Sequence, residues 1–129
     1  MRYELLLLDD KFRFKICAIE RDGRCDVRDF ILECRRHNES LHKRISSLLY
    51  ILGKNGRHSN QQIVKQVRKG LFELKPDGHR MYYFYLDGDR IVFAHAAKKG
   101  TKKVQTKDIE KAESIRDGYL KYMAGKAKS

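Results

Sequence analysis

The stretch Lys69–Lys103, KGLFELKPDGHRMYYFYLDGDRIVFAHAAKKGTKK, decides the fold of this chain. It holds three apolar runs that are separated by two turn signals, Lys-Pro-Asp-Gly at residues 75–78 and Asp-Gly-Asp at residues 87–89. Turns of this length and composition join antiparallel neighbours. The middle run contains Tyr-Tyr-Phe-Tyr at residues 82–85, and such aromatics suit a half-buried pleated surface better than a helix. The stretch therefore predicts a three-stranded meander that ends in a basic loop.

The sequence before the meander predicts one strand and two helices. Residues 12–20 alternate with the period of two that marks a strand. Apolar residues between 27 and 34 then follow helical spacing, and Asp26 is a plausible N-cap. A second helix follows Asn38 and Ser40, both reasonable caps, and Gly53 can end it. Residues 54–62 read as a polar loop, and the spacing of residues 63–67 suggests one short helical turn.

The part after the meander predicts a helix over residues 106–123, with Asp108 and Glu110 in its first turn. The expected element order is β-α-α-β-β-β-α in a single domain of residues 1–129, with loosely ordered ends at 1–11 and 124–129. This order predicts an α+β fold of two layers, in which the two N-terminal helices pack on an antiparallel-dominated sheet. The strand order stays open, and a parallel partner for the first strand is allowed.

Composition narrows the class of partner and the compartment. The 129 residues include 29 Lys+Arg against 17 Asp+Glu, a formal net charge of +12. Such an excess favours polyanions, with RNA or DNA ahead of an acidic membrane or an acidic protein. The three cysteines show no CxxC spacing, which suits structural thiols in a reducing compartment. The apolar run at residues 5–8 is too short for a signal peptide or a membrane span, so we expect a cytoplasmic protein.

Few residues offer catalytic chemistry. The five histidines show no HExxH spacing and the chain has no Gly-rich phosphate loop, so we expect no metal site. The remaining candidate is a cationic site, because Arg80 opens the central strand and antiparallel pairing can bring it near the basic loop. Its other members are Lys69, Lys98, Lys99, Lys102 and Lys103. Such a patch would hold phosphates in a salt-dependent manner. The alternative is an ordinary solvated surface.

The tyrosines of residues 82–85 also allow two interpretations. They are either core residues or, where alternation turns them outward, platforms on which unpaired bases stack.

Several segments resemble the successive motifs of the HigB-like toxins, a phage-related branch of the RelE superfamily. The segments are GLFEL (residues 70–74), RMYY (80–83), DGDRIV (87–92), HAAKK (95–99) and DIEKA (108–112). The similarity is strongest from Val67 to Tyr119. The order and spacing of the five segments together make it specific. It implies a RelE-like fold and an endonuclease that cuts mRNA on the ribosome and needs neither a metal nor an organic cofactor. It also implies neutralisation by a small helix-turn-helix antitoxin of the HigA type.

The same resemblance implies roles for individual residues. Arg80 matches the strand arginine of the family, which would stabilise the phosphate. Lys98 and Lys99 match its basic pair, in which one lysine would serve as general acid or base and the other as a clamp. Glu73 would orient Arg80 from the adjacent strand. His95 fits the pattern as a supporting residue, and a structural role on its strand is the alternative.

RNA contacts would come from lysines around this set, at Lys69, Lys75, Lys102 and Lys103. Two other functions stay open at this point. One is a non-catalytic RNA- or DNA-binding protein on the same scaffold, and the other is an interaction module for an acidic partner.

Overall fold

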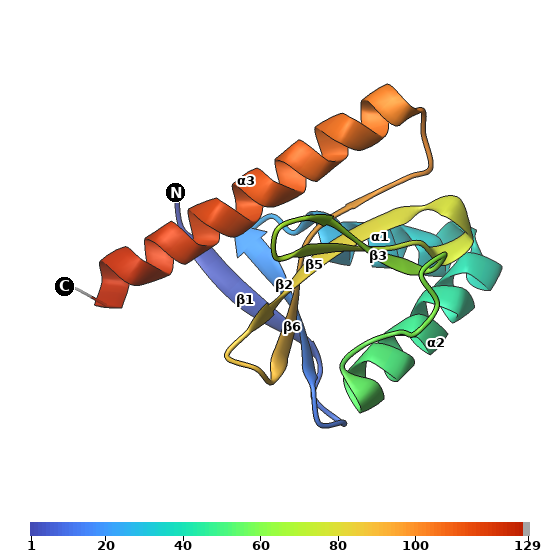
Figure 1. Ribbon diagram of the computed structural model, residues 1–129, viewed down its shortest axis with the longest axis horizontal. Helices are drawn as coiled ribbons and strands as arrows, with labels where there is room; N and C mark the ends of the chain where they lie inside the picture. Colours follow the sequence, from blue (N-terminus) through green and yellow to red (C-terminus); the bar gives the residue numbers. More distant parts are fainter. Residues whose placement is uncertain (128–129) are drawn as a thin grey trace.

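The predicted meander forms one half of a six-stranded mixed sheet in the order β1-β2-β6-β5-β4-β3 (Figure 1). The computed structural model describes residues 1–127. Its elements are β1 (Tyr3–Asp9), β2 (Lys15–Arg21), α1 (Asp26–His37), α2 (Glu39–Asn55), β3 (Val64–Arg68), β4 (Leu71–Leu74), the short 3-10 turn η1 (Pro76–Gly78), β5 (Arg80–Leu86), β6 (Arg90–Ala97) and α3 (Lys102–Ala127).

The meander itself is confirmed as β4, β5 and β6, paired antiparallel in sequence order. The middle strand is mostly core, since Tyr82 and Tyr83 are fully buried. Tyr85 faces outward at the other end of the strand, and its hydroxyl donates to the Gly56 carbonyl at 2.6 Å. The core interpretation is therefore correct for Tyr82 and Tyr83.

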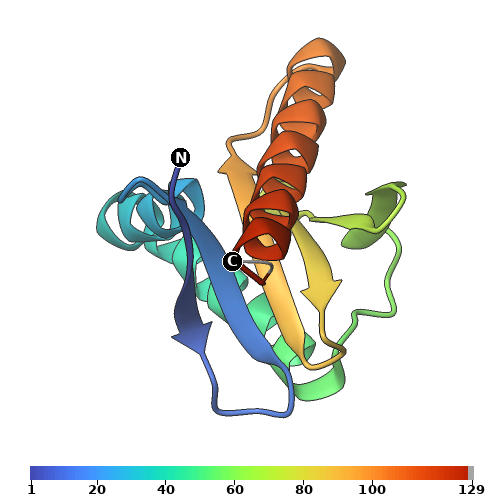
Figure 2. The same cartoon turned by 90° about the vertical axis from the view of Figure 1, so that its left-hand side faces the viewer.

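The α+β class is confirmed, and the arrangement is consistent with a RelE-like fold. β2 lies parallel to β6, and α1 and α2 connect β2 to the strands beyond. One core lies between the sheet and α1 and α2, and a second lies between the sheet and α3. The expectation of two layers is thus corrected, because α3 covers the opposite face from α1 and α2 (Figure 2).

The N-terminal segment corrects the expected loose end at residues 1–11. Residues 3–9 form β1, which pairs antiparallel with β2 at the edge of the sheet. The pattern concealed this strand because its four consecutive leucines do not alternate. Leu6 and Leu8 pack toward the α1/α2 core while Leu5 packs toward the α3 core. Leucines on both faces of this edge strand thus contact a core, whereas Leu7 is 57% exposed.

β3 corrects the expected helical turn at residues 63–67. Val64 and Val67 are three residues apart, which is a helical spacing as well as an odd spacing along a strand. In the structure Val64 packs against the α1/α2 core and Val67 against the α3 core. Because helices cover both faces of the sheet, two valines at an odd spacing along a strand can each contact a core.

Three predicted helix ends also shift. Cys25, not Asp26, is the N-cap of α1, and its Sγ accepts from the Arg28 N–H at 3.4 Å. Asn38 caps α2 as predicted, but α2 continues through Gly53 and ends at Gly56. α3 begins at Lys102, so that Asp108 lies beyond the first turn.

α3 also includes residues 124–127, which corrects that part of the expected loose C-terminal end. Residues 128–129 of the prediction lie outside the described residues. No helix within residues 1–127 combines the length and the apolar character that crossing a membrane requires.

We predict that Gly56→Ala destabilises the protein more than Gly23→Ala. Both glycines have positive φ, at +78° and +82°, so both variants lose about 1–2 kcal/mol from backbone strain. Only at Gly56 would a Cβ meet another group, since it would lie 2.5 Å from the Phe14 ring, whereas Gly23 has open space. Urea unfolding of both variants measures the difference. Equal losses would show that the Phe14 ring moves aside freely.

Candidate functional site

The register of the sheet brings Arg80 to the basic loop, as the sequence predicts. Arg80 is the first residue of β5 and pairs with Ala97, near the end of β6. Lys98 and Lys99 follow Ala97 directly, so their backbone lies beside that of Arg80. We call Arg80, Lys98 and Lys99 the cationic cluster.

Arg80 and Lys99 meet at Gly78, at the end of η1. The Nη1 of Arg80 donates to the Gly78 carbonyl at 3.0 Å. The Lys99 side chain lies over the α-carbon of the same glycine, because a Cβ built there would be 3.2 Å from Lys99 Cδ and 3.6 Å from its Nζ. Two cationic groups, one from β5 and one from the loop after β6, thus share one small residue, and a larger side chain at this position would push Lys99 away.

Glu73 holds Arg80 from the neighbouring strand. The carboxylate is 2% exposed and its Oε2 lies 3.6 Å from the Arg80 Nε. A buried carboxylate needs a cation nearby, since its desolvation is otherwise costly. Glu73 Oε1, Arg80 Nε and the Tyr82 hydroxyl have no hydrogen-bond partner within residues 1–127. Glu73 therefore lies where the prediction requires it to orient Arg80.

Lys98 points to the other face of the sheet. Its Nζ lies 3.0 Å from Oε1 of Glu33 on α1, and the neighbouring ammonium lowers the pKa of Glu33. This ion pair is exposed to solvent, so it is readily exchanged for another anion. The cationic cluster therefore straddles the end of the sheet, with Arg80 bound to a carboxylate on the α3 face and Lys98 bound to one on the α1/α2 face.

His79 lies against the cationic cluster, although no sequence pattern indicated it. Its Nδ1 accepts the Lys99 backbone N–H at 3.2 Å, so a neutral ring carries its proton on Nε2. Burial lowers the pKa of His79, and Lys99, Lys98 and Arg80 lower it further against the opposing effect of Asp77. The ring is thus a neutral donor among cations. Only the fold could reveal it, because these charges come from two separate strands.

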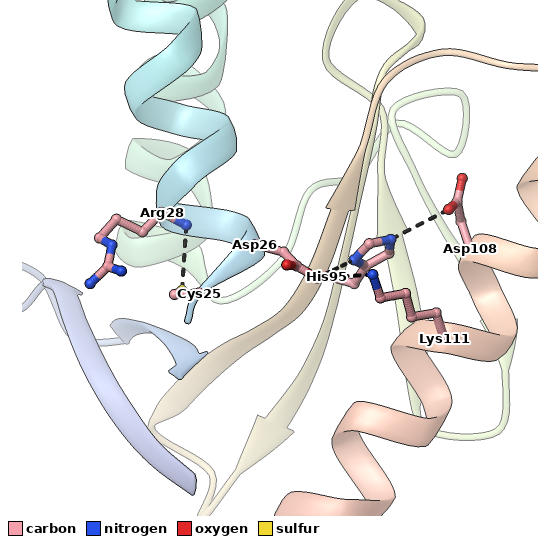
Figure 3. A network of polar contacts seen from close by, with 6 residues as sticks. All are labelled: Cys25, Asp26, Arg28, His95, Asp108 and Lys111. Atoms are coloured by element: carbon pink, nitrogen blue, oxygen red, sulfur yellow. Dashed lines mark hydrogen bonds and ion pairs between the residues drawn. The ribbon is translucent and has the colours of Figure 1, made fainter. Parts of the chain in front are cut away.

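His95 lies in a different polar network, which Figure 3 shows. Its Nδ1 lies 3.0 Å from Oδ2 of Asp26 on α1, and its Nε2 lies 3.4 Å from Oδ1 of Asp108 on α3. Lys111 also reaches Asp26, at 3.4 Å. The ring stacks parallel to Tyr82. Both ring nitrogens are thus engaged by carboxylates, and the network joins β6 to one helix on each face of the sheet.

A β-bulge turns His95 toward this network. The β5–β6 register shifts between Tyr82 and Tyr83, so that His95 pairs with Tyr82 while Phe93 pairs with Tyr83. Without the extra residue, His95 would share the face of Phe93, which belongs to the α1/α2 core. Bulges redirect side chains in this way. Burial alone would raise the pKa of Asp26, but His95 and Lys111 outweigh it and lower that pKa.

The four lysines predicted to contact RNA divide into two groups. Lys75 follows β4 at the end of the sheet where Arg80 begins β5. Lys102 and Lys103 form the exposed first turn of α3, just after the basic loop. Lys69 lies at the opposite end of β4, where its carbonyl accepts from Arg116 of α3 at 2.9 Å. The fold thus leaves Lys69 apart from the cationic cluster.

No group of three or more His, Cys, Asp or Glu side chains among residues 1–127 has the arrangement that could hold a metal ion. Chemically, the end of the sheet offers a guanidinium, two ammonium groups and a neutral imidazole within one small region. Such a set can bind a phosphodiester and stabilise extra negative charge on it.

The chain is similar to a known protein family. A family model described as phage-derived protein Gp49-like (DUF891) matches residues 33–117, more than half of the chain. The matched segment includes every member of the cationic cluster together with Glu73, His79 and His95, but it excludes Asp26. No curated protein matches the chain.

We predict that Asp26→Asn lowers stability at neutral pH by about 1 kcal/mol, the order of a partly exposed charged hydrogen bond. The folded-state pKa of Asp26 is lowered. The wild type therefore has this extra stability at pH values above the unfolded-state pKa of Asp26, and it loses the stability as the pH falls through the folded-state pKa. The difference between the two proteins should therefore shrink below about pH 4. Urea unfolding at pH 7, 5 and 3 measures it. Asp29→Asn, in the same helix turn, controls for the helix dipole, and a pH-independent difference would contradict the prediction.

Proposed function

The chain belongs to the phage-derived Gp49-like family, a toxin-like family of toxin–antitoxin systems, and from this we propose that it is a HigB-like toxin of the RelE superfamily. In this proposal it is a metal-independent endoribonuclease that cuts mRNA on the ribosome. A small helix-turn-helix antitoxin of the HigA type neutralises it.

The convergence of Arg80 and Lys99 on Gly78 is the observation that supports this proposal. RNA cleavage without a metal needs positive charge where a phosphorane forms, and it needs groups that accept and donate protons. Arg80 and Lys99 are held at the same glycine, so this cationic pair is preorganised to supply positive charge where the phosphorane forms. Arg80 is the better candidate for the phosphate, because its hydrogen bond to Gly78 and its ion pair with Glu73 orient the guanidinium and a planar fork matches two phosphate oxygens.

The proposed reaction is an internal transfer within the RNA. The ribose 2′-oxygen attacks the adjacent phosphorus and loses its proton to a basic group, while the bond from phosphorus to the 5′-oxygen breaks and that oxygen takes up a proton. The products are a 2′,3′-cyclic phosphate and a 5′-hydroxyl. Arg80 stabilises the phosphorane, one of Lys98 and Lys99 transfers a proton, and the other holds the backbone.

The RNA strand would continue from the cationic cluster across the first turn of α3. Lys102 and Lys103 supply exposed charge there, and Lys75 supplies it on the side of β4. His95 has a supporting role in this proposal, since its contacts with Asp26 and Asp108 fix α1 and α3 on either side of β6. Lys69 lies too far along β4 to extend this path.

One observation favours a second candidate, a non-catalytic RNA-binding relative of these toxins. Both Arg80 and Lys98 are already paired with carboxylates, Glu73 and Glu33 respectively. A protein that only binds RNA needs no group that transfers protons. The two candidates differ in whether the message is cut.

We predict that Lys99→Ala weakens RNA binding and cleavage while Lys69→Ala leaves both near the wild-type level. The two variants lose the same charge, but only Lys99 lies at Gly78. Removing one phosphate contact should reduce the slope of log affinity against log salt by about one. Fluorescence anisotropy with a short single-stranded RNA at several salt concentrations measures the slope. Equal losses in both variants would indicate diffuse charge instead of a site.

We predict that Arg80→Gln, combined with Glu73→Gln, strongly slows cleavage. The double variant avoids leaving the buried Glu73 carboxylate unpaired, which would destabilise the fold. Loss of the guanidinium should slow cleavage about 100- to 1000-fold. Arg80→Lys should retain binding but cleave more slowly than the wild type, because lysine lacks the planar fork.

The assay for this prediction uses translating ribosomes with a defined message, and thermal unfolding confirms that the variants fold. Cleavage by the double variant at the wild-type rate would refute the role of Arg80. A wild-type protein that binds RNA but leaves the message intact would favour the non-catalytic candidate.

A further inference from the structure

A pocket of about 230 Å³ opens beside the cationic cluster, between α1, the start of α2 and the end of the sheet. Its apolar wall consists of Phe30, Cys34 and Leu41, and its rim carries Glu33, His79 and Lys98. Nothing in the proposed cleavage reaction uses this apolar wall. Its rim nevertheless shares Lys98 with the cationic cluster and includes His79, which binds the backbone of Lys99.

The shape and polarity of the pocket indicate the kind of group that fits it. An apolar wall suits a flat, weakly hydrated ring, and the adjacent cations suit an anion attached to that ring. A nucleotide joins these two parts, because its base is planar and apolar on both faces while its phosphate is negative. Proteins that bind single-stranded RNA combine stacking surfaces with basic grooves in the same way.

We propose that this pocket receives one unstacked nucleobase of a single-stranded RNA whose neighbouring phosphate lies on Arg80 and Lys99. The inference takes its ligand class from the proposed function and adds a binding site to it. The Phe30 and His79 rings offer stacking surfaces, with centroids 5.9 Å apart and planes tilted by 53°. A single base can therefore lie against one ring and meet the edge of the other.

The rim supplies polar groups for the edge of the base. His79 carries its proton on Nε2, because Nδ1 accepts the Lys99 N–H, so the ring can donate a hydrogen bond. Glu33 can accept one from an amino or imino group once its solvent-exposed ion pair with Lys98 opens. Lys98 is then released to the phosphate. Base entry and phosphate binding are thus coupled through a single exposed ion pair.

The test fills the pocket without removing core contacts. Cys34→Leu projects extra methyl groups into the cavity from a residue that is 6% exposed, and leucine favours the helix. Cys34→Ser keeps the size and serves as the matched control. The probes are a single-stranded hexauridine and an inorganic polyphosphate chain of similar charge, whose binding is followed by competition in fluorescence anisotropy.

We expect Cys34→Leu to bind hexauridine about fivefold to a hundredfold more weakly than the wild type, the range expected for one lost stacking interaction. Polyphosphate binding should be unchanged in both variants, and Cys34→Ser should bind hexauridine more tightly than Cys34→Leu because serine leaves the cavity open. Equal hexauridine binding by the wild type and Cys34→Leu would overturn the proposal. A parallel loss of polyphosphate binding in Cys34→Leu would also overturn it, since it would show that the substitution disturbs the cations and not a base site.

A second measurement uses the unmodified protein and does not depend on the folding of a variant. A hexauridine that contains one 4-thiouridine is crosslinked by light, and the attached peptide is identified by mass spectrometry. Attachment at Phe30, Cys34 or His79 supports the pocket, whereas attachment confined to other segments contradicts it. These readouts need no cleavage, so base binding without message cleavage would refute the nuclease proposal while the pocket stands.

Discussion

The antiparallel register between β5 and β6, with Arg80 opposite Ala97, is the constraint on which the candidate site depends. It places the first residue of one strand beside the basic loop that leaves the other, and it lets Arg80 and Lys99 share Gly78. Backbone hydrogen bonds between the two strands fix this arrangement and hold it against the mutual repulsion of the cations. A shift of the register by one residue would turn Arg80 to the other face of the sheet and separate it from Glu73.

Two polar systems lie near this end of the sheet and differ in character. The cationic cluster has solvent-exposed lysines and an ion pair between Lys98 and Glu33 that water screens. The His95 network is mostly enclosed and joins three elements through carboxylates. The first is suited to exchange its partners and the second to hold α1 and α3 in place. The cationic cluster can therefore exchange its partners while the His95 network keeps α1 and α3 in position.

Buried polar atoms at Arg80 and its neighbours reduce the stability of the fold. Oε1 of Glu73, Nε of Arg80 and the hydroxyl of Tyr82 lack hydrogen-bond partners among residues 1–127. Burial, with Glu73 nearby, raises the pKa of Tyr82 and keeps its hydroxyl neutral. Unsatisfied groups of this kind destabilise a fold, and proteins tolerate them mainly at functional sites. Glu73 and Tyr82, which pair across β4 and β5, lie next to Arg80, and this agrees with the role proposed for Arg80.

The sequence by itself determined the meander, its turns and the basic loop, because alternation, aromatic runs and Asp-Gly turns are local signals. It also placed Arg80 beside Lys98 and Lys99, since hairpin pairing follows from short turns. It did not reveal β1 and β3, because each has apolar residues that pack on both faces of the sheet, and neither strand therefore alternates. His79, the Asp26–His95–Asp108 network and the pocket at Phe30 were decided only by the tertiary structure. Each depends on a bulge or on contacts between segments far apart in the chain, and no local pattern of residues encodes either.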